Sequence, residues 1–232
     1  MTAASTYIVS VVNNFELYEH CIKENNFLAN CRLKFYDNTK ENIGIAERYN
    51  DFIETNITPD SDDCWVIFCH QDFGFEEDPD LKLATLSPDC IYGPVGINIR
   101  LCFSLWPPKI FRRKVTEGRF KQGRNNTDFE VIGNYLPAPK KVLACDCCCL
   151  IVHSSLIKRC NLRFDPQCKF HLYAEDFEIS ARRKYGIPVK AVQFACCHQG
   201  IGNYSDPQFF ETLEYLKKKH GLRKLYSTNP YC

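Results

Sequence analysis

A histidine and an aspartate stand two positions apart, at His70 and Asp72, directly after the apolar segment CWVIFC. A carboxylate, an imidazole and phosphate oxygens together form a ligand set that suits Mn²⁺ or Mg²⁺. His198, which follows a second short apolar segment, would complete this set. The alternative interpretation is structural, because polar residues also cap strands, and for His198 the spacing alone favours an ordinary hydrogen-bonding role at a strand end.

Two adjacent acids, Glu175 and Asp176, open a segment with helical spacing at residues 173–186. The helix dipole favours acids in the first turn, which is a purely structural explanation. A carboxylate where a helix begins at a sheet edge can also act as a general base for a hydroxyl group. Because adjacent helix residues diverge by about 100°, we expect only one of the two to face a site.

The chain contains fifteen cysteines, and its N-terminus lacks the basic region of a signal peptide. We therefore interpret most of the cysteines as buried thiols in a reducing compartment. Cys145 and Cys148 have the CxxC spacing of zinc sites, but they lie in a strand-like run where they would point to opposite faces. A zinc-binding interaction protein is thus the least favoured alternative.

The overall composition excludes several functional classes. The net charge of +1 over 232 residues provides no global field for nucleic acid. No run of about eighteen apolar residues predicts a transmembrane helix. Neither GxGxxG nor GxxxxGK[ST] occurs, so the phosphate-binding fingerprints of dinucleotide dehydrogenases and P-loop enzymes are missing. We expect a cytoplasmic protein, free or peripherally attached to a membrane, with no nucleic-acid partner.

Strand-like and helical segments alternate along the first third of the chain, which indicates an α/β fold. Right-handed crossovers between successive strands would give a mostly parallel central sheet flanked by helices. The expected strands are residues 7–12, 32–36, 65–69, 90–95, 142–152 and 189–192, and the expected helices are residues 15–31, 43–53, 78–86, 173–186 and 208–220.

The length suits a single domain over residues 1–232. We expect a Rossmann-like, nucleotide-binding half at residues 1–100 and an acceptor-binding and catalytic half at residues 101–232. Residues 103–141 contain nine Lys or Arg against three acids, together with prolines and glycines. This composition predicts an irregular basic loop, which would suit an anionic partner.

Several motifs in this order resemble those of GT-A fold glycosyltransferases, in particular the family 2-like members. YIVSVVNN is similar to the family's first strand and nucleotide-contacting turn, and NIGIAERYN to its recurring helix start. FCHQDFGF occupies the place of the metal-binding DxD motif. The remaining matches are FYDNTKEN, IYGPVGI, DCCCLIVHSSLI, LRFDP and HLYAEDFEISARRKYGIPV.

The resemblance implies roles for particular residues. The donor nucleotide-sugar would contact Ser10, Val11, Asn13, Asp37, Asn42, Gln71 and Asp146. Asp72 would bind Mn²⁺ or Mg²⁺ with His198, and His70 replaces the usual first Asp of DxD. Asp176 would be the general base of an inverting transfer, with Glu175 beside it.

The expected function is therefore metal-assisted, inverting transfer of a sugar from a nucleotide-diphospho-sugar, a UDP-sugar by resemblance. The acceptor would be a saccharide or a lipid-linked glycan, and the basic segment 103–141 would favour one that carries phosphate. One alternative is a nucleotidyltransferase, although VVNNFELYEH lacks the basic glycine-rich loop of that class. The other is a non-catalytic nucleotide- or sugar-binding module that has lost most of its metal site.

Overall fold

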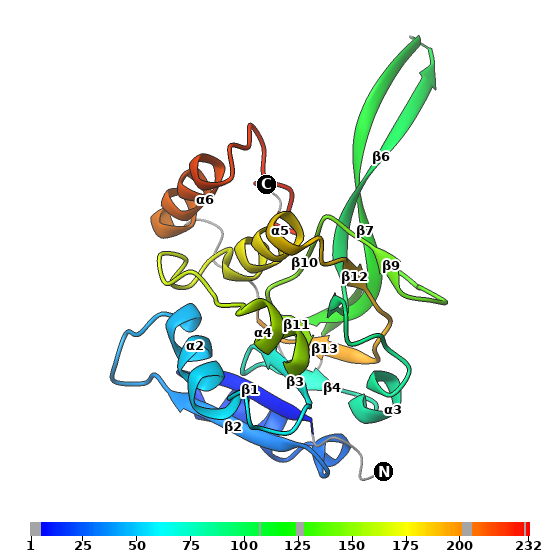
Figure 1. Ribbon diagram of the computed structural model, residues 1–232. Coiled ribbons are helices and arrows are strands. Elements are labelled where there is room, and N and C mark those ends of the chain that lie inside the picture. The colour runs from blue at the N-terminus through cyan, green and yellow to red at the C-terminus, as the bar shows by residue number, and fades with distance from the viewer. Residues whose placement is uncertain (1–5, 107, 124–127, 201–205, 230) are drawn as a thin grey trace.

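The structure is a computed structural model that describes residues 6–106, 108–123, 128–200, 206–229 and 231–232. It has an α/β fold in which helices cover a seven-stranded sheet (Figure 1). The strand order in this sheet is β2 (Arg32–Asp37), β1 (Tyr7–Val12), β3 (Trp65–Cys69), β11 (Cys149–His153), β5 (Ile91–Gly93), β12 (Val189–Ala191) and β9 (Lys140–Lys141). The sheet takes strands from both of the expected halves of the chain.

The prediction of a mostly parallel sheet is wrong, because the sheet is mixed. β1 pairs in parallel with β2 and with β3, and β12 pairs in parallel with β5. β11 runs antiparallel to both β3 and β5, and β9 runs antiparallel to β12. β11 enters the sheet directly from β10 (Ala144–Cys145) of a second sheet. The right-handed helical crossover that would make it parallel is therefore lacking.

The expected burial of β3 on both faces is confirmed, since all five of its residues are buried. Val66 and Phe68 pack into one hydrophobic cluster, and Trp65, Ile67 and Cys69 pack into the other, as the two-residue period of a strand requires. This strand therefore carries His70 from the centre of the core to the edge of the sheet.

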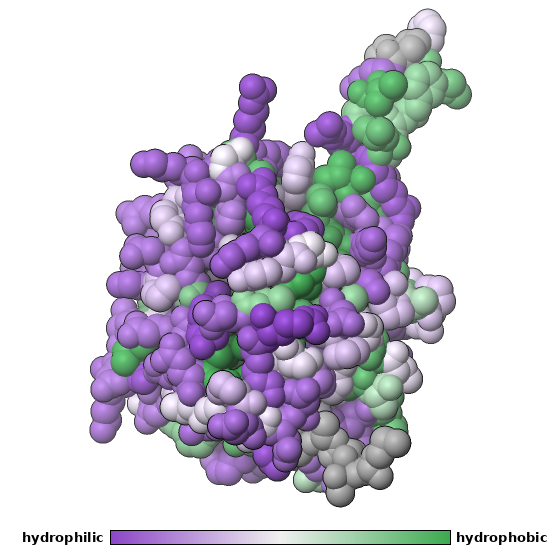
Figure 2. Space-filling model, viewed as in Figure 1, coloured by the Kyte–Doolittle hydropathy of each residue, from purple (hydrophilic) through white to green (hydrophobic). Residues whose placement is uncertain are grey.

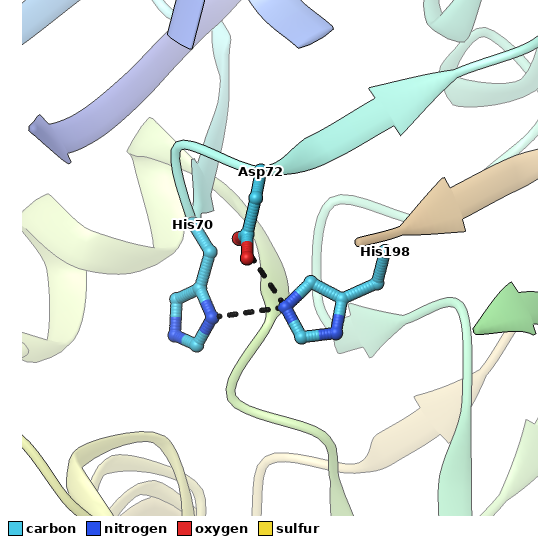
Figure 3. Close-up of side chains that lie close together, drawn as sticks. All are labelled: His70, Asp72 and His198. Atoms are coloured by element: carbon cyan, nitrogen blue, oxygen red, sulfur yellow. Dashed lines mark hydrogen bonds and ion pairs between the residues drawn. The ribbon is translucent and has the colours of Figure 1, made fainter. Parts of the chain in front are cut away.

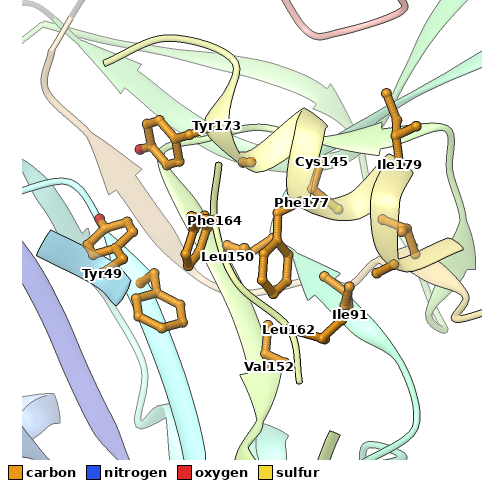
Figure 4. Close-up of a cluster of buried hydrophobic side chains, with 14 of the residues drawn as sticks. Tyr49, Ile91, Cys145, Leu150, Val152, Leu162, Phe164, Tyr173, Phe177 and Ile179 are labelled. Atoms are coloured by element: carbon orange, nitrogen blue, oxygen red, sulfur yellow. The ribbon is translucent and has the colours of Figure 1, made fainter. Parts of the chain in front are cut away.

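The first of these clusters lies between the sheet, α2 (Ile45–Asn56) and α5 (Tyr173–Tyr185) (Figure 4). The rings of Phe164 and Phe177 are stacked with their centroids 4.4 Å apart, and Tyr49 and Tyr173 meet edge to face at 5.8 Å. Full burial of one such side chain contributes about 1.5–3 kcal/mol. The packing thus holds the first turn of α5 rigidly beside the end of β3.

The helical segments follow the predictions with two exceptions, the helix α4, which was not predicted, and the segment at 15–31. α2, α5 and α6 (Pro207–Lys219) form where expected, α3 (Pro79–Leu83) is shorter, and α4 (Ser154–Cys160) follows β11. The expected helix at 15–31 is instead divided into α1 (Phe15–Tyr18), the π-helix η1 (Glu19–Lys23) and the 3₁₀ turn η2 (Asn26–Leu28). Asn25 causes the last break, because its side-chain oxygen caps the amide of Phe27 and its amide group binds the carbonyls of Cys21 and Phe75.

The prediction of an irregular loop over 103–141 is also wrong. Much of this region lies in a second sheet, to which it contributes the end of β6 (Gly96–Leu105), β7 (Pro108–Gly123) and β8 (Phe129–Asn134), which pairs with β7. The other strands of this sheet are β10, β13 (Cys196–His198) and β4 (Phe73–Phe75). β6 and β7 form an antiparallel hairpin that projects from the body (Figure 1). Within this sheet, β13 places His198 opposite Phe73 of β4 and beside Gln122 of β7.

Candidate functional site

Three side chains from the ends of two strands converge on one point (Figure 3). Nε2 of His198 lies 3.3 Å from Nδ1 of His70 and 3.3 Å from Oδ1 of Asp72. One potential ligand atom from each of the three residues lies within 4.8 Å of the others. The structure thus brings together the three residues that the sequence analysis named as metal ligands.

The tautomer of His198 is set by Gln122 of β7. The amide nitrogen of Gln122 donates to the backbone carbonyls of His198 and Gly200, which turns its Oε1 atom toward His198. That oxygen lies 3.2 Å from Nδ1 of His198 and can only accept a hydrogen bond. Nδ1 therefore donates to Gln122, and Nε2 faces Asp72 and His70, where it donates to the carboxylate when protonated and presents a lone pair when it is not.

The tautomer of His70 is set in the same way by Tyr173, the first residue of α5. The Tyr173 hydroxyl donates to the carbonyl of Cys147 at 3.0 Å, so it accepts a hydrogen bond from Nε2–H of His70 at 2.8 Å. The lone pair of Nδ1 then faces His198. Histidine ligands of metals have this arrangement, in which an outer partner holds the protonated ring nitrogen.

The charges at this point are those of a cation site. Burial alone would raise the pKa of Asp72. Its hydrogen bond to His198 and the nearby imidazoles outweigh burial and lower the pKa to about 2. Burial and the neighbouring His198 lower the pKa of His70, so its ring is neutral at pH 7. In contrast, contact with Asp72 outweighs burial and raises the pKa of His198. One carboxylate and two ring nitrogens thus converge, and once the Nε2 proton of His198 is displaced such a set fits a first-row divalent cation.

Gly200 provides the space that this arrangement needs. A Cβ atom added to Gly200 would overlap Oδ2 of Asp72, so only glycine lets the backbone come this close to the carboxylate. The carboxylate is held between Gly200 on one side and His198 on the other.

A first cavity, of about 180 Å³, lies beside the triad at the carboxyl end of β1. Val11, Asn13 and Gln71 line it together with His70 and Asp72. The side-chain oxygen of Gln71 accepts from the backbone amides of Asn13 and Asn14 at 2.8 and 2.9 Å. Gln71 thereby joins the turn after β1 to the triad.

The other predicted donor contacts lie outside the described lining of this cavity. Ser10 is fully buried with its hydroxyl 3.5 Å from Sγ of Cys69, so it packs within the core. Asp37 is exposed and accepts from both the amide and the hydroxyl of Thr39. Asn42 is exposed as well. The roles of these three residues stay predictions from resemblance.

A second cavity of the same volume adjoins the triad on its other side, where His70 and His198 form part of its wall. Glu175 faces this cavity from the first turn of α5 and is 2% exposed. Its Oε1 atom accepts from Ser227, whereas its Oε2 atom has no hydrogen-bond partner among the described residues. Burial raises the pKa of Glu175 to about 7. A buried carboxyl group that titrates near neutrality is typical of a general acid or base.

Leu172 turns the chain so that α5 can present these groups. Its φ of 56° lies in the left-handed region, which is strained for a leucine. The turn brings Tyr173 to His70 and Glu175 to the second cavity. Strained backbone of this kind is concentrated at functional sites.

Asp176 points elsewhere, as the 100° divergence of adjacent helix residues predicts for one of the pair. Its carboxylate lies 2.7 Å from Nε2 of His220 and 2.8 Å from Nζ of Lys219, and it lines neither of the two cavities beside the triad. The buried ion pair fastens α5 to the end of α6. Asp176 therefore has a structural role in the geometry seen here.

Asp146 lines the second cavity from the loop before β11. Its carboxylate accepts from the hydroxyl of Thr228 and from the amide of Cys148 at 2.9 Å. Burial raises the pKa of Asp146, but these hydrogen bonds and the charge of His198 outweigh it, so the pKa is lowered overall. The residue is thus an ionised acid on the side of the triad opposite the first cavity.

Comparison with solved structures finds similarity to TarS of S. aureus, a wall teichoic acid glycosyltransferase. One TarS structure is 9% identical with a TM-score of 0.51, and the match covers 96% of this chain and 40% of that one. A structure of TarS 1–349 is 11% identical with a TM-score of 0.50, over 96% of this chain and 67% of that one. The chain has a glycosyltransferase-like fold. It spans well under half of the longer TarS structure.

No model of a known protein family matches the chain, and no curated protein matches it in sequence. The likeness to TarS therefore concerns the fold alone. Among the described residues, no helix is both long and apolar enough to cross a membrane.

The sequence analysis missed four residues that build this site: Gln122, Tyr173, Gly200 and Ser227. Gln122 lies in the segment that was expected to be irregular, and Ser227 follows the terminal helix without any motif. Only Tyr173 carried a usable signal, since it opens the helical segment whose first turn contains the two acids.

Proposed function

We propose that this protein is a glycosyltransferase that moves a sugar from a nucleotide-diphospho-sugar to a hydroxyl acceptor. The observation that carries the proposal is the position of the His70, Asp72 and His198 triad between two cavities. One cavity adjoins the turn after β1, and the other contains a buried carboxyl group with a raised pKa. The TarS-like fold supports the same activity.

The first cavity would hold the nucleotide, with Val11, Asn13 and Gln71 against it. His70, Asp72 and His198 would hold Mn²⁺ or Mg²⁺, which when bound supplies positive charge to the diphosphate leaving group. The chain itself keeps both imidazole lone pairs directed at this point through Gln122 and Tyr173. We take the donor to be a UDP-sugar from the sequence resemblance.

The second cavity would hold the acceptor, and Glu175 replaces Asp176 as the proposed general base. Oε2 of Glu175 is free to accept the proton of an acceptor hydroxyl, whereas the Asp176 carboxylate is engaged by Lys219 and His220. The acceptor oxygen forms a bond to the anomeric carbon as the bond from that carbon to the diphosphate breaks. Attack from the cavity opposite the leaving group inverts the anomeric centre.

Nucleotide binding tests the donor half of this proposal. UDP, GDP and dTDP are titrated by calorimetry with and without Mn²⁺ into wild type, Asp72→Ala and the matched control Asp60→Ala, which removes an exposed carboxylate outside both cavities. We expect Mn²⁺-dependent binding of UDP that Asp72→Ala abolishes and Asp60→Ala retains. Binding of no nucleotide under any condition would overturn the proposal.

A non-catalytic nucleotide-sugar-binding module is the second candidate, and the single carboxylate in the triad favours it. The two functions differ in turnover. A transferase in the presence of Mn²⁺ slowly hydrolyses its own UDP-sugar donor to UDP, and Glu175→Gln should slow this release. Tight binding of UDP-sugars with no release of UDP from any of them would assign the chain as a binding module.

A further inference from the structure

The outer end of the β6–β7 hairpin carries large apolar side chains in water. Leu101, Phe103, Leu105, Trp106 and Ile110 are 64% to 90% exposed. Figure 2 shows hydrophobic residues along the projecting arm, away from the mostly hydrophilic face of the body. Monomeric proteins rarely expose contiguous apolar patches, and such a patch marks an interaction site. A projecting two-stranded ribbon is also only marginally stable in water, so this arm gains from being covered.

The strand register gathers the apolar side chains on one face of the arm. Phe103 lies opposite Ile110, and residues opposite each other in an antiparallel pair point to the same side. Leu101 and Leu105 stand two positions before and after Phe103, so they share its face. Trp106 lies at the turn that joins the two strands.

Basic residues surround this apolar face. Arg100, Lys109, Arg112, Arg113 and Lys114 lie on the two strands, and no Asp or Glu occurs between residues 96 and 116. Lys109 lies opposite Ser104, and Arg113 lies opposite Arg100, on the face away from the leucines. Arg100 pairs with Glu117, and Lys114 binds the carbonyls of Asn229 and Cys232, so Lys109, Arg112 and Arg113 are the cations of the tip. An apolar tip with three cations and no acid is complementary to a surface that is apolar below and negatively charged above.

We propose that the tip of the β6–β7 hairpin inserts into the interface of a membrane that contains anionic lipids. Leucine, isoleucine and phenylalanine would enter the boundary between headgroups and acyl chains, Trp106 would lie at headgroup level, and the cations would meet lipid phosphates. The insertion is shallow, because the unpaired edges of a two-stranded ribbon exclude it from the hydrocarbon core. Pairing of the arm with a second copy would bring two sets of three cations together, which disfavours that alternative.

The two tryptophans of the chain allow a direct test. Trp65 is 8% exposed in β3, whereas Trp106 is 90% exposed at the tip. We expect the fluorescence of the whole protein to shift to the blue on addition of phosphatidylcholine–phosphatidylglycerol vesicles, and far less with phosphatidylcholine alone. Trp106→Phe should remove the shift while vesicle co-sedimentation persists. Absence of binding to both kinds of vesicle would overturn the proposal.

Matched variants separate specific insertion from general stickiness. Phe103→Ser with Leu105→Ser should weaken binding to the mixed vesicles at least tenfold, whereas Leu81→Ser, at a site 74% exposed on α3, should not change it. Arg112→Glu with Arg113→Glu should remove the preference for anionic vesicles. If Leu81→Ser weakened binding equally, or if the tip variants instead dissolved a dimer seen by light scattering, the proposal would be wrong. Nucleotide binding, which the tip does not touch, reports that each variant is folded.

Discussion

Replacing Glu175 with glutamine should stop sugar transfer and also change how stability depends on pH. The side chain is almost completely buried, and burial raises its pKa from 4.5 to about 7. A tenfold change in an ionisation equilibrium corresponds to about 1.4 kcal/mol, so the folded protein disfavours the charged form by about 3 kcal/mol. Glutamine keeps an oxygen for the hydroxyl of Ser227 and cannot ionise.

The sign of the effect follows from the raised pKa. The contribution of Glu175 to stability is fully present below its unfolded pKa of 4.5, and it is lost as the pH rises through about 7. The glutamine variant lacks this loss. The difference in free energy of unfolding between the variant and wild type should therefore move in favour of the variant by roughly 2 to 3 kcal/mol between pH 5 and pH 8.

Urea denaturation at the two pH values measures this difference, and Glu117→Gln is the matched control. Glu117 is equally buried, but its ion pairs with Arg100 and Lys140 outweigh burial and lower its pKa. Its contribution is present above the unfolded pKa and is lost only as the pH falls through the lower folded pKa, so the control should stay constant from pH 5 to pH 8. A constant difference for Glu175→Gln as well would refute the reasoning, as would retained sugar transfer in that variant.

Three further substitutions test the surroundings of Glu175 and the triad. Gly200→Ala should weaken Mn²⁺ binding at least tenfold by calorimetry, because the new methyl group displaces the Asp72 carboxylate; unchanged affinity would show that the carboxylate is not a ligand. Gln122→Leu should weaken Mn²⁺ binding about 10- to 100-fold, since His198 loses the partner that sets its tautomer; an unaltered titration would contradict that role. Asp176→Asn should lower the free energy of unfolding by about 2 kcal/mol, because the buried His220 ring loses its carboxylate acceptor and Lys219 keeps only Asp165, yet it should retain turnover below its melting temperature. Loss of turnover without loss of stability would return the role of general base to Asp176.

The sequence predicts the first half of the fold well because local pattern and tertiary structure agree there. Strands at residues 7–12 and 65–69 are apolar apart from Ser10, and the sheet buries most of their side chains on both faces. The pattern could not show that β11 is antiparallel to its neighbours, since direction depends on how the chain enters the sheet. It also failed for the hairpin, because a strand with exposed apolar and basic side chains lacks the alternation that burial of one face produces.

The grouping of His70, Asp72 and His198 could be predicted from the sequence, but the features that suit it to a cation could not. His70, Asp72 and His198 are of ligand-forming types, and the first two are close in the chain. Whether an imidazole presents a lone pair or a proton depends on its outer partner, and those partners are Tyr173, which starts α5, and Gln122, which lies on β7.

The choice between Glu175 and Asp176 has the same physical origin. Helix geometry requires the two carboxylates to diverge, but it does not say which one meets a cation. That is decided by Lys219 and His220, which α6 brings to Asp176 from more than forty positions along the chain. Among the described residues Glu175 pairs with the Ser227 hydroxyl and with no Lys or Arg, so its burial in the wall of the second cavity is not offset and raises its pKa to about 7.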